Sequence, residues 1–217
     1  MIFEEDMSIQ MKRTEQLEKT RAAILRTATR LFLQKGFAQT STRDIAKEIG
    51  ITQPALYHHF SDKEVLFLSV MTDFSGKVRT DINKVLRKHK LSPEEQLFEI
   101  VKVLKKHHPI SIYDQYNQAM QLLSKSAQRK FNMIFVMDYL IPIGEYFKQP
   151  AVNLRADLLP KEAAELFLAS LTPVFGTYQV IGGQAITNDQ RTKLIIDCIV
   201  NGLKRTPKEE IIQSLTS

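Results

Sequence analysis

Apolar residues recur along most of the chain at steps of three and four residues, the spacing typical of amphipathic helices. The first helix is predicted from about Thr14 or Lys19 to Lys35, with an apolar stripe of Ile24, Leu25, Ala28, Leu31 and Phe32. Gly36 follows, and a glycine there accepts the left-handed conformation that ends many helices. Signals for strands and hairpins are nearly absent. The pattern therefore predicts an all-α chain.

Two short helices are predicted next. The first begins after Ser41, which has an acidic residue three positions later as in a capping box, and it ends at Gly50. The second begins after Thr52, whose hydroxyl can cap the first free backbone N–H groups, and it runs to about His59. Pro54 suits its first turn, where an N–H has no partner within the helix.

The rest of the chain also has helical spacing. Ser61 and Glu64 form another capping-box pattern, which opens a long helix to about Lys88. Further helices are predicted from the Ser92-Pro93-Glu94-Glu95 run, in two or three pieces over 110–149 broken near Pro142 or Pro150, from Pro160 to about Ile181 before Gly182-Gly183, and from about Thr187 to before Pro207.

Two short helices joined by a glycine turn are the helix-turn-helix pattern, in which the second helix reads bases in the major groove. Gln53 at its start can offer an amide to an adenine edge, and Pro54 and Ala55 can touch a thymine methyl. The candidates for phosphate contacts are Tyr57, His58, His59, Lys63 and Arg43. Arg43 is also a candidate for a guanine contact. Leu56 and Phe60, four residues apart, are expected to pack inward.

Charge supports a nucleic-acid partner only weakly. The chain has a net charge of +6, but residues 1–73 carry ten basic and ten acidic residues, and the surplus lies in residues 74–130. Residues 7–63 alone contain ten basic and five acidic residues. The basic stretch Lys77–Lys90 is more typical of a solvated face than of a second nucleic-acid surface. The motif, and not the charge, carries the interpretation.

The run TSTRDIAKEIGITQPALYHHFSDKEVLF, with ILRTATRLFLQKGFAQTS before it, resembles the DNA-binding segment of the TetR family. The likeness covers about residues 20–70. It implies a homodimeric transcriptional regulator, a repressor that binds a palindromic operator and is released by a small-molecule effector. The resemblance implies that Ser41 caps a helix near the DNA. It also implies that the residues facing the DNA are Thr42, Arg43, Gln53, Pro54, Ala55, Tyr57, His58, His59 and Lys63.

These patterns divide the chain into a flexible N-terminal extension (1–18), a helix-turn-helix domain (19–66), and a helical effector-binding and dimerisation domain (67–217). Aromatic and methionine residues within 110–149 are candidates for an effector pocket, with core packing as the alternative: Tyr113, Tyr116, Met120, Phe135 and Tyr139. Apolar residues on the last two long helices are candidates for a dimer interface: Phe167, Leu171, Phe175, Tyr178, Ile195 and Ile199.

No catalytic residues, metal ligands or cofactor site are predicted. His58-His59 and His107-His108 are adjacent and do not face one another on a helix, and the second pair is interpreted as the solvated end of a helix. Cys198 is interpreted as a small buried hydrophobe. No apolar run approaches the roughly 18 residues of a membrane span, so a cytoplasmic protein is expected.

Two other classes of protein stay open. One is a helical ligand-binding or interaction protein whose head does not read DNA, and the balanced charge of residues 1–73 is its only support. The other is a helical enzyme with a site assembled from residues distant in sequence. No nucleophile elbow, phosphate-cradling loop or catalytic carboxylate pair supports the second class.

Overall fold

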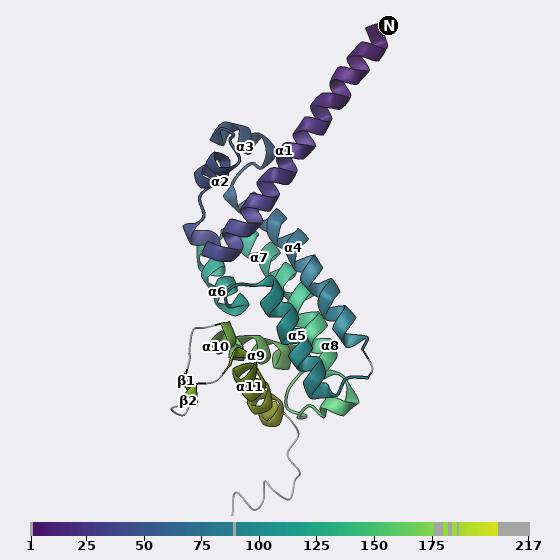
Figure 1. Cartoon of the computed structure of the whole chain (residues 1–217), viewed down its shortest axis with the longest axis vertical. Helices are drawn as coiled ribbons and strands as arrows, with labels where there is room; N and C mark the ends of the chain where they lie inside the picture. Colours follow the sequence, from purple (N-terminus) through teal and green to yellow (C-terminus); the bar gives the residue numbers. More distant parts are fainter. Residues whose placement is uncertain (1, 89, 176–179, 182–183, 186, 204–217) are drawn as a thin grey trace, which may run out of the picture. The chain divides into compact units, whose positions relative to one another are not determined.

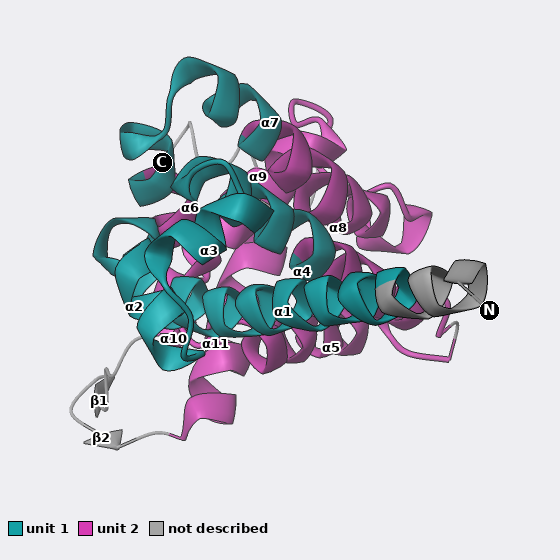
Figure 2. Cartoon of the chain, turned by 90° about the horizontal axis from the view of Figure 1, so that it is seen from above, with its two compact units in different colours: residues 1–74, 118–131 teal, residues 75–117, 132–217 magenta. Residues whose placement is uncertain are grey.

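The computed structural model describes residues 2–88, 90–175, 180–181, 184–185 and 187–203 (Figure 1). Most of these residues are helical, so the predicted all-α class is confirmed. The chain forms two compact units, which Figure 2 colours separately. One unit takes its residues from 1–74 and 118–131, and the other from 75–117 and 132–217.

The first unit is built on helices joined by short turns. Its elements are α1 (Ile2–Gln39), α2 (Thr42–Glu48), α3 (Gln53–His59), the first part of α4 (Lys63–Leu86), the end of α6 (Ile112–Leu122) and the start of α7 (Lys125–Phe135). The core is aliphatic and aromatic. The Phe67 ring meets the rings of Phe32, Phe37 and Phe131 edge-on, at centroid distances of 5.1, 5.0 and 5.0 Å. The stripe predicted on the first helix supplies Ile24, Ala28, Leu31 and Phe32 to this core.

Residues 2–18, which the sequence predicted to be a flexible extension, are helical in the structure. They begin helix α1, and residues 10–19 of that helix are exposed. Neither proline nor glycine interrupts the chain before Gly36, and the Glu15–Lys19 ion pair (2.6 Å) links successive turns. Gly36 itself has a φ of 76°, so the glycine stop is confirmed, and a short helical turn to Gln39 follows it.

Side-chain caps begin the two short helices as predicted. Ser41 Oγ accepts a hydrogen bond from the Asp44 N–H (3.0 Å), and Thr52 Oγ1 accepts one from the Ala55 N–H (3.3 Å). The cap predicted at Ser61 is wrong, because α4 begins one residue later than such a cap requires. Asp62 Oδ1 accepts from the Val65 N–H instead (2.8 Å).

Glu64, the predicted partner of Ser61, has a different role. Its carboxylate accepts hydrogen bonds from the Ser124 N–H (2.7 Å) and hydroxyl (2.6 Å), directly before α7. A carboxylate at the start of a helix also interacts favourably with the helix dipole. The start of α4 is thereby joined to the start of α7 within the first unit.

The second unit contains the remaining helices and one short hairpin. Its elements are the second part of α4, α5 (Pro93–His107), parts of α6 and α7, the π-helix η1 (Val136–Leu140), α8 (Ile141–Phe147), the 3₁₀ helix η2 (Pro150–Val152), α9 (Pro160–Ser170), α10 (Thr172–Phe175), β1 (Val180–Ile181), β2 (Gln184–Ala185) and α11 (Asn188–Leu203). The Ser92 capping box at the start of α5 is confirmed. Pro142 follows η1, and a proline removes the hydrogen bond that would continue regular helical winding.

The single helix predicted from Pro160 to Ile181 is wrong. The segment divides into α9 and α10, and Val180–Ile181 pairs with Gln184–Ala185 as an antiparallel hairpin. Pro173 cannot donate a helical hydrogen bond, so regular winding from α9 is interrupted there. Valine and isoleucine also have high strand propensity, which suits the first strand.

His107-His108 is not a solvated helix end. His107 Nε2 lies 2.9 Å from Asp81 Oδ2 on α4, and buried His108 places Nε2 2.9 Å from the Tyr139 hydroxyl. Burial lowers the pKa of His108 to about 3, and the charge of His107 adds to the effect. Adjacent residues point in different directions, so one histidine enters the core while the other stays at its edge.

His108 gives the fold a pH dependence. The unfolded chain binds this proton near the ordinary pKa of 6.5, and the folded chain only near 3, so stability falls as the pH drops below about 6.5. Between pH 7 and pH 5 we expect His108 to remove about 2 kcal/mol from the free energy of unfolding. Urea unfolding at pH 7 and at pH 5 measures this loss of unfolding free energy. His108→Gln will show a smaller loss than the wild type and than the exposed control His58→Gln, and equal losses in all three would contradict the assignment.

Candidate nucleic-acid interface

The turn between α2 and α3 is short and fixed by the backbone. Gly50 has a φ of 75°, a conformation that favours glycine, and the Ile51 N–H donates to the Ala46 carbonyl at 3.0 Å. Leu56 and Phe60 are 0% and 2% exposed, as predicted from their spacing. Because these two side chains hold α3 against the core, the opposite face of α3 is turned outward.

A polar network fixes side chains on that outward face. Gln53 Nε2 donates to Thr42 Oγ1 (3.0 Å) and to the Tyr57 hydroxyl (3.3 Å), and the two hydroxyls are 3.1 Å apart. The network joins the first residue of α2 to the first and second turns of α3. It therefore holds the Gln53 and Tyr57 side chains in defined positions before any ligand arrives.

The network also refines the roles predicted from the sequence. Both amide hydrogens of Gln53 are engaged, which leaves Oε1 as the atom that can meet a base edge in this conformation. A lone acceptor matches the exocyclic amine of adenine or cytosine rather than making the two-bond contact predicted for adenine. Thr42 is only 6% exposed, so its hydroxyl orients Gln53 and Tyr57.

The remaining predicted DNA-facing residues differ in exposure. Pro54, His58 and Arg43 are exposed, Tyr57 is 41% exposed, and Ala55, His59 and Lys63 are half-buried. Lys63 Nζ lies 4.2 Å from the centroid of the Phe37 ring, and burial lowers the pKa of Lys63. The structure thus joins Thr42, Gln53 and Tyr57 directly, and it packs Lys63 against the Phe37 ring.

Arg21 supports the end of α3, a role that no local sequence signal indicated. Its guanidinium donates to the His59 carbonyl (3.0 Å) and lies 4.3 Å from the centroid of the Phe60 ring. A cation at a helix C-terminus interacts favourably with the carbonyls there. Only the packing of α1 near α3 brings these groups together, because 38 residues separate Arg21 from His59.

Three of the five predicted effector-pocket residues meet in the second unit. The Tyr116 and Phe135 rings stack at 4.1 Å, and Phe135 stacks on Tyr139 at 5.5 Å. Tyr139 is fully buried, and burial raises its pKa. Tyr113 is half-buried on α6, and Met120 belongs to the first unit.

Several predictions for the last helices need correction. Phe167 and Leu171 are 0% and 1% exposed, so they form core of the second unit and leave almost no surface for a partner. Phe175, Ile195 and Ile199 are half-buried, and Tyr178 lies outside the described residues.

Cys198 is exposed and not buried as predicted. Ile196 and Val200, four residues apart, occupy the buried face of α11, and the position midway between them points outward. A groove of about 510 Å³ lies along the outward face, with Leu166, Ser170, Leu194, Ile195, Cys198, Ile199 and Gly202 around it. Leu166 and Leu194 are 48% and 43% exposed, which makes them better candidates for an interface than Phe167 and Leu171.

The described residues contain no group of three or more histidine, cysteine or acidic side chains placed to hold a metal ion. Among the same residues, none of the helices is both long and apolar enough to cross a membrane.

Two short helices at a glycine turn, with a fixed polar face on the second, define the helix-turn-helix class of regulators. The family model for bacterial regulatory proteins of the tetR family matches residues 24–70. Residues 24–70 therefore resemble the DNA-binding segment of the TetR family of transcriptional regulators.

Curated relatives match part of the chain. The chain is 32% identical over 77 residues to the uncharacterised HTH-type transcriptional regulator YdgC of Bacillus subtilis, covering 36% of this chain and 40% of YdgC. It is 44% identical over 59 residues to the regulator AcrR of Shigella flexneri, covering 27% of each. The chain thus matches less than half the length of these relatives.

The likeness of the fold extends further. A TetR-family regulator from Agrobacterium tumefaciens superposes with a TM-score of 0.66 at 16% identity, covering 87% of this chain and 99% of that one. At this level of identity the comparison supports the fold alone.

Proposed function

We propose that this chain is a DNA-binding regulator that recognises a palindromic operator as a homodimer through α3. The observation that carries the proposal is the Thr42–Gln53–Tyr57 network on the outward face of α3. Side chains held in place before binding lose less conformational entropy in the complex. An ordered polar network on an exposed face is expected of a recognition surface, whereas a merely solvated surface needs no such order.

The geometry suggests that some of these residues contact bases of the operator and others contact its phosphates. The N-terminal turn of α3 enters the major groove, where Gln53 Oε1 accepts from a base amine and Pro54 and Ala55 contact a thymine methyl. Tyr57, His58 and Lys63 bind phosphates and fix the register. Arg43 reaches a phosphate or a guanine from the first turn of α2.

A dimer accounts best for the exposed apolar groove of the second unit. Leu166, Leu194, Ile195, Cys198 and Ile199 lie on α9 and α11, the last two long helices in the described part of the chain. Two copies that pair these helices cover the groove and present two α3 helices related by two-fold symmetry. The operator then needs two half-sites about 34–36 Å apart, or a multiple of this distance.

Regulation by an effector completes the proposal. Residues 19–66 read DNA, and residues 67–217 bind the partner subunit and a small molecule that releases the operator, as the family resemblance implies. The distance between the two α3 helices of a dimer must match the spacing of the two half-sites, so a small change in that distance weakens binding. Such a repressor works in the cytoplasm, where its DNA is.

A gel mobility shift with DNA from upstream of the chain's own gene tests this function. We expect a shifted complex whose affinity falls steeply as the salt concentration rises, because several phosphates are neutralised. An unrelated duplex of equal length is the control. A chain that shifts no fragment even at low salt would instead be the ligand-binding protein whose head does not read DNA.

A further inference from the structure

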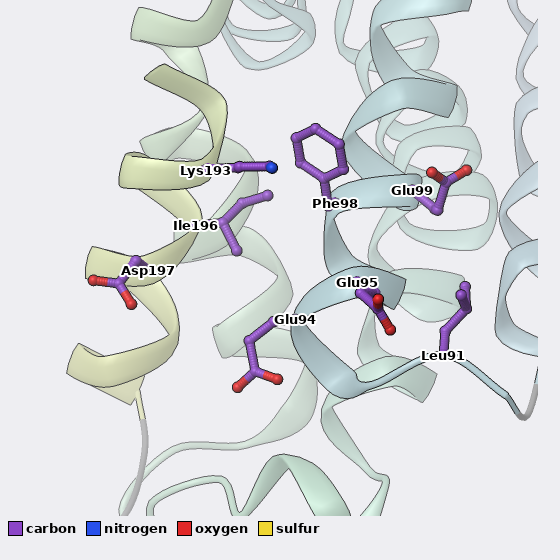
Figure 3. A pocket seen from close by; sticks show the side chains of 8 residues that line it. All are labelled: Leu91, Glu94, Glu95, Phe98, Glu99, Lys193, Ile196 and Asp197. Carbon is purple, nitrogen blue, oxygen red and sulfur yellow. The ribbon is translucent and has the colours of Figure 1, made fainter. Parts of the chain in front are cut away.

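A cavity of about 530 Å³ lies in the second unit between α5 and α11 (Figure 3). Phe98 and Ile196 point toward one another across it, and Leu91 adds a third apolar side chain to its lining. The volume is in the range of pockets that hold drug-sized molecules. None of the aromatic residues proposed above for the effector lines this cavity.

The charged residues of the lining are mostly acidic. Four carboxylates, of Glu94, Glu95, Glu99 and Asp197, surround the cavity against the single ammonium of Lys193. Glu95 accepts a hydrogen bond from the Ser92 N–H (2.8 Å), and Asp197 accepts one from Asn201 Nδ2 (3.0 Å). A concave surface lined by one sign of charge attracts ligands of the opposite sign.

Phe98 already attracts cations of the chain itself. Lys102 Nζ lies 4.9 Å and Lys193 Nζ 5.7 Å from the centroid of its ring. Lys102 is paired with Glu99 at 2.7 Å, whereas the Lys193 side chain extends from α11 toward Phe98 (Figure 3). The face of an aromatic ring attracts a cation through its quadrupole. Lys193 therefore marks a place in the cavity where a positive charge is favourable.

We propose that the cavity between α5 and α11 is a binding site for a hydrophobic organic cation. The apolar body of the ligand covers Leu91, Phe98 and Ile196. Its positive charge lies before the Phe98 ring, where it displaces the Lys193 ammonium and interacts with the surrounding carboxylates. The site does not depend on the proposed DNA-binding function, since it is built entirely from residues of the second unit.

Two probes of nearly equal shape and opposite charge test the proposal. Tetraphenylphosphonium and tetraphenylborate are each equilibrated with the full chain by dialysis, without DNA. We expect saturable binding of the cation at one site per chain, and affinity for the anion weaker by about tenfold or more. Absent binding of the cation, or equal or tighter binding of the anion, would overturn the proposal.

Variants locate the site. Glu94→Gln removes one negative charge and will weaken tetraphenylphosphonium binding about threefold, whereas Lys193→Met removes the competing ammonium and will strengthen it about threefold. Glu145→Gln, an exposed carboxylate on α8 outside the lining, is the matched control and will leave binding unchanged. Unchanged binding in both cavity variants, with circular dichroism showing that they fold, would place the cation elsewhere and refute the assignment.

Discussion

Gln53→Ala combined with Tyr57→Ala will lower operator affinity by about a hundredfold or more. The double change removes the base acceptor of Gln53, the phosphate contact of Tyr57, and the network that orients both. A base contact contributes about 1–3 kcal/mol of discrimination, and loss of a second contact compounds it. Fluorescence anisotropy with a labelled operator measures the change.

The controls separate recognition from folding. Leu17→Ala truncates a side chain that is 52% exposed on α1 and will leave affinity unchanged. Tyr57→Phe removes only the hydroxyl that meets Gln53 and Thr42, so its loss will be smaller than that of the double variant. Wild-type affinity in a folded double variant would mean that α3 is not the reading helix.

Leu194→Glu will convert the proposed dimer to a monomer at micromolar concentration. Leu194 is 43% exposed in the groove along α9 and α11, and pairing of two copies there would bury its side chain. A charge buried without a partner costs several kcal/mol, so dimerisation will weaken by about a hundredfold or more. Sedimentation equilibrium measures the mass, and operator binding will weaken with it because each half-site is then bound singly.

Leu122→Glu is the matched control for the interface. Leu122 is a 54% exposed leucine at the end of α6 in the first unit, so the new charge stays in water and the dimer persists. If Leu194→Glu remains a dimer, the groove along α9 and α11 is not the interface. If both variants become monomers, the groove is not the specific interface.

The helix-turn-helix was predictable because its signals are local. Capping residues precede α2 and α3, a glycine fills a turn that needs positive φ, and inward residues recur at helical spacing. Each of these signals acts within a few residues of the chain. The two short helices, the turn between them and the inward residues Leu56 and Phe60 were therefore predictable without tertiary information.

Other features of the structure depend on contacts that are distant in sequence. The Gln53 amide was expected to be free for adenine, but its partners lie on α2 and one turn along α3. Arg21 reaches the end of α3 across 38 residues, and His108 is buried because Tyr139, 31 residues later, meets it. Periodicity alone could not supply these pairings.

The last helices show the same limit. Phe167 and Cys198 both belong to apolar runs, and their spacing alone did not say which face of the helix packs inward. Packing in the second unit buries Phe167 completely and leaves Cys198 exposed. On α9 the candidate for the dimer surface is therefore Leu166 in place of its neighbour Phe167. On α11 the candidate surface now includes Leu194, the neighbour of Ile195.

Selection from a random library of DNA duplexes tests the central claim most directly, because it needs no knowledge of the regulated gene. The purified chain is expected to enrich an inverted repeat whose half-sites lie one or more helical turns apart. The Gln53→Ala, Tyr57→Ala double variant should fail to enrich the same repeat. A folded wild-type chain that enriches no sequence at low salt would contradict the assignment of α3 as a DNA-reading helix.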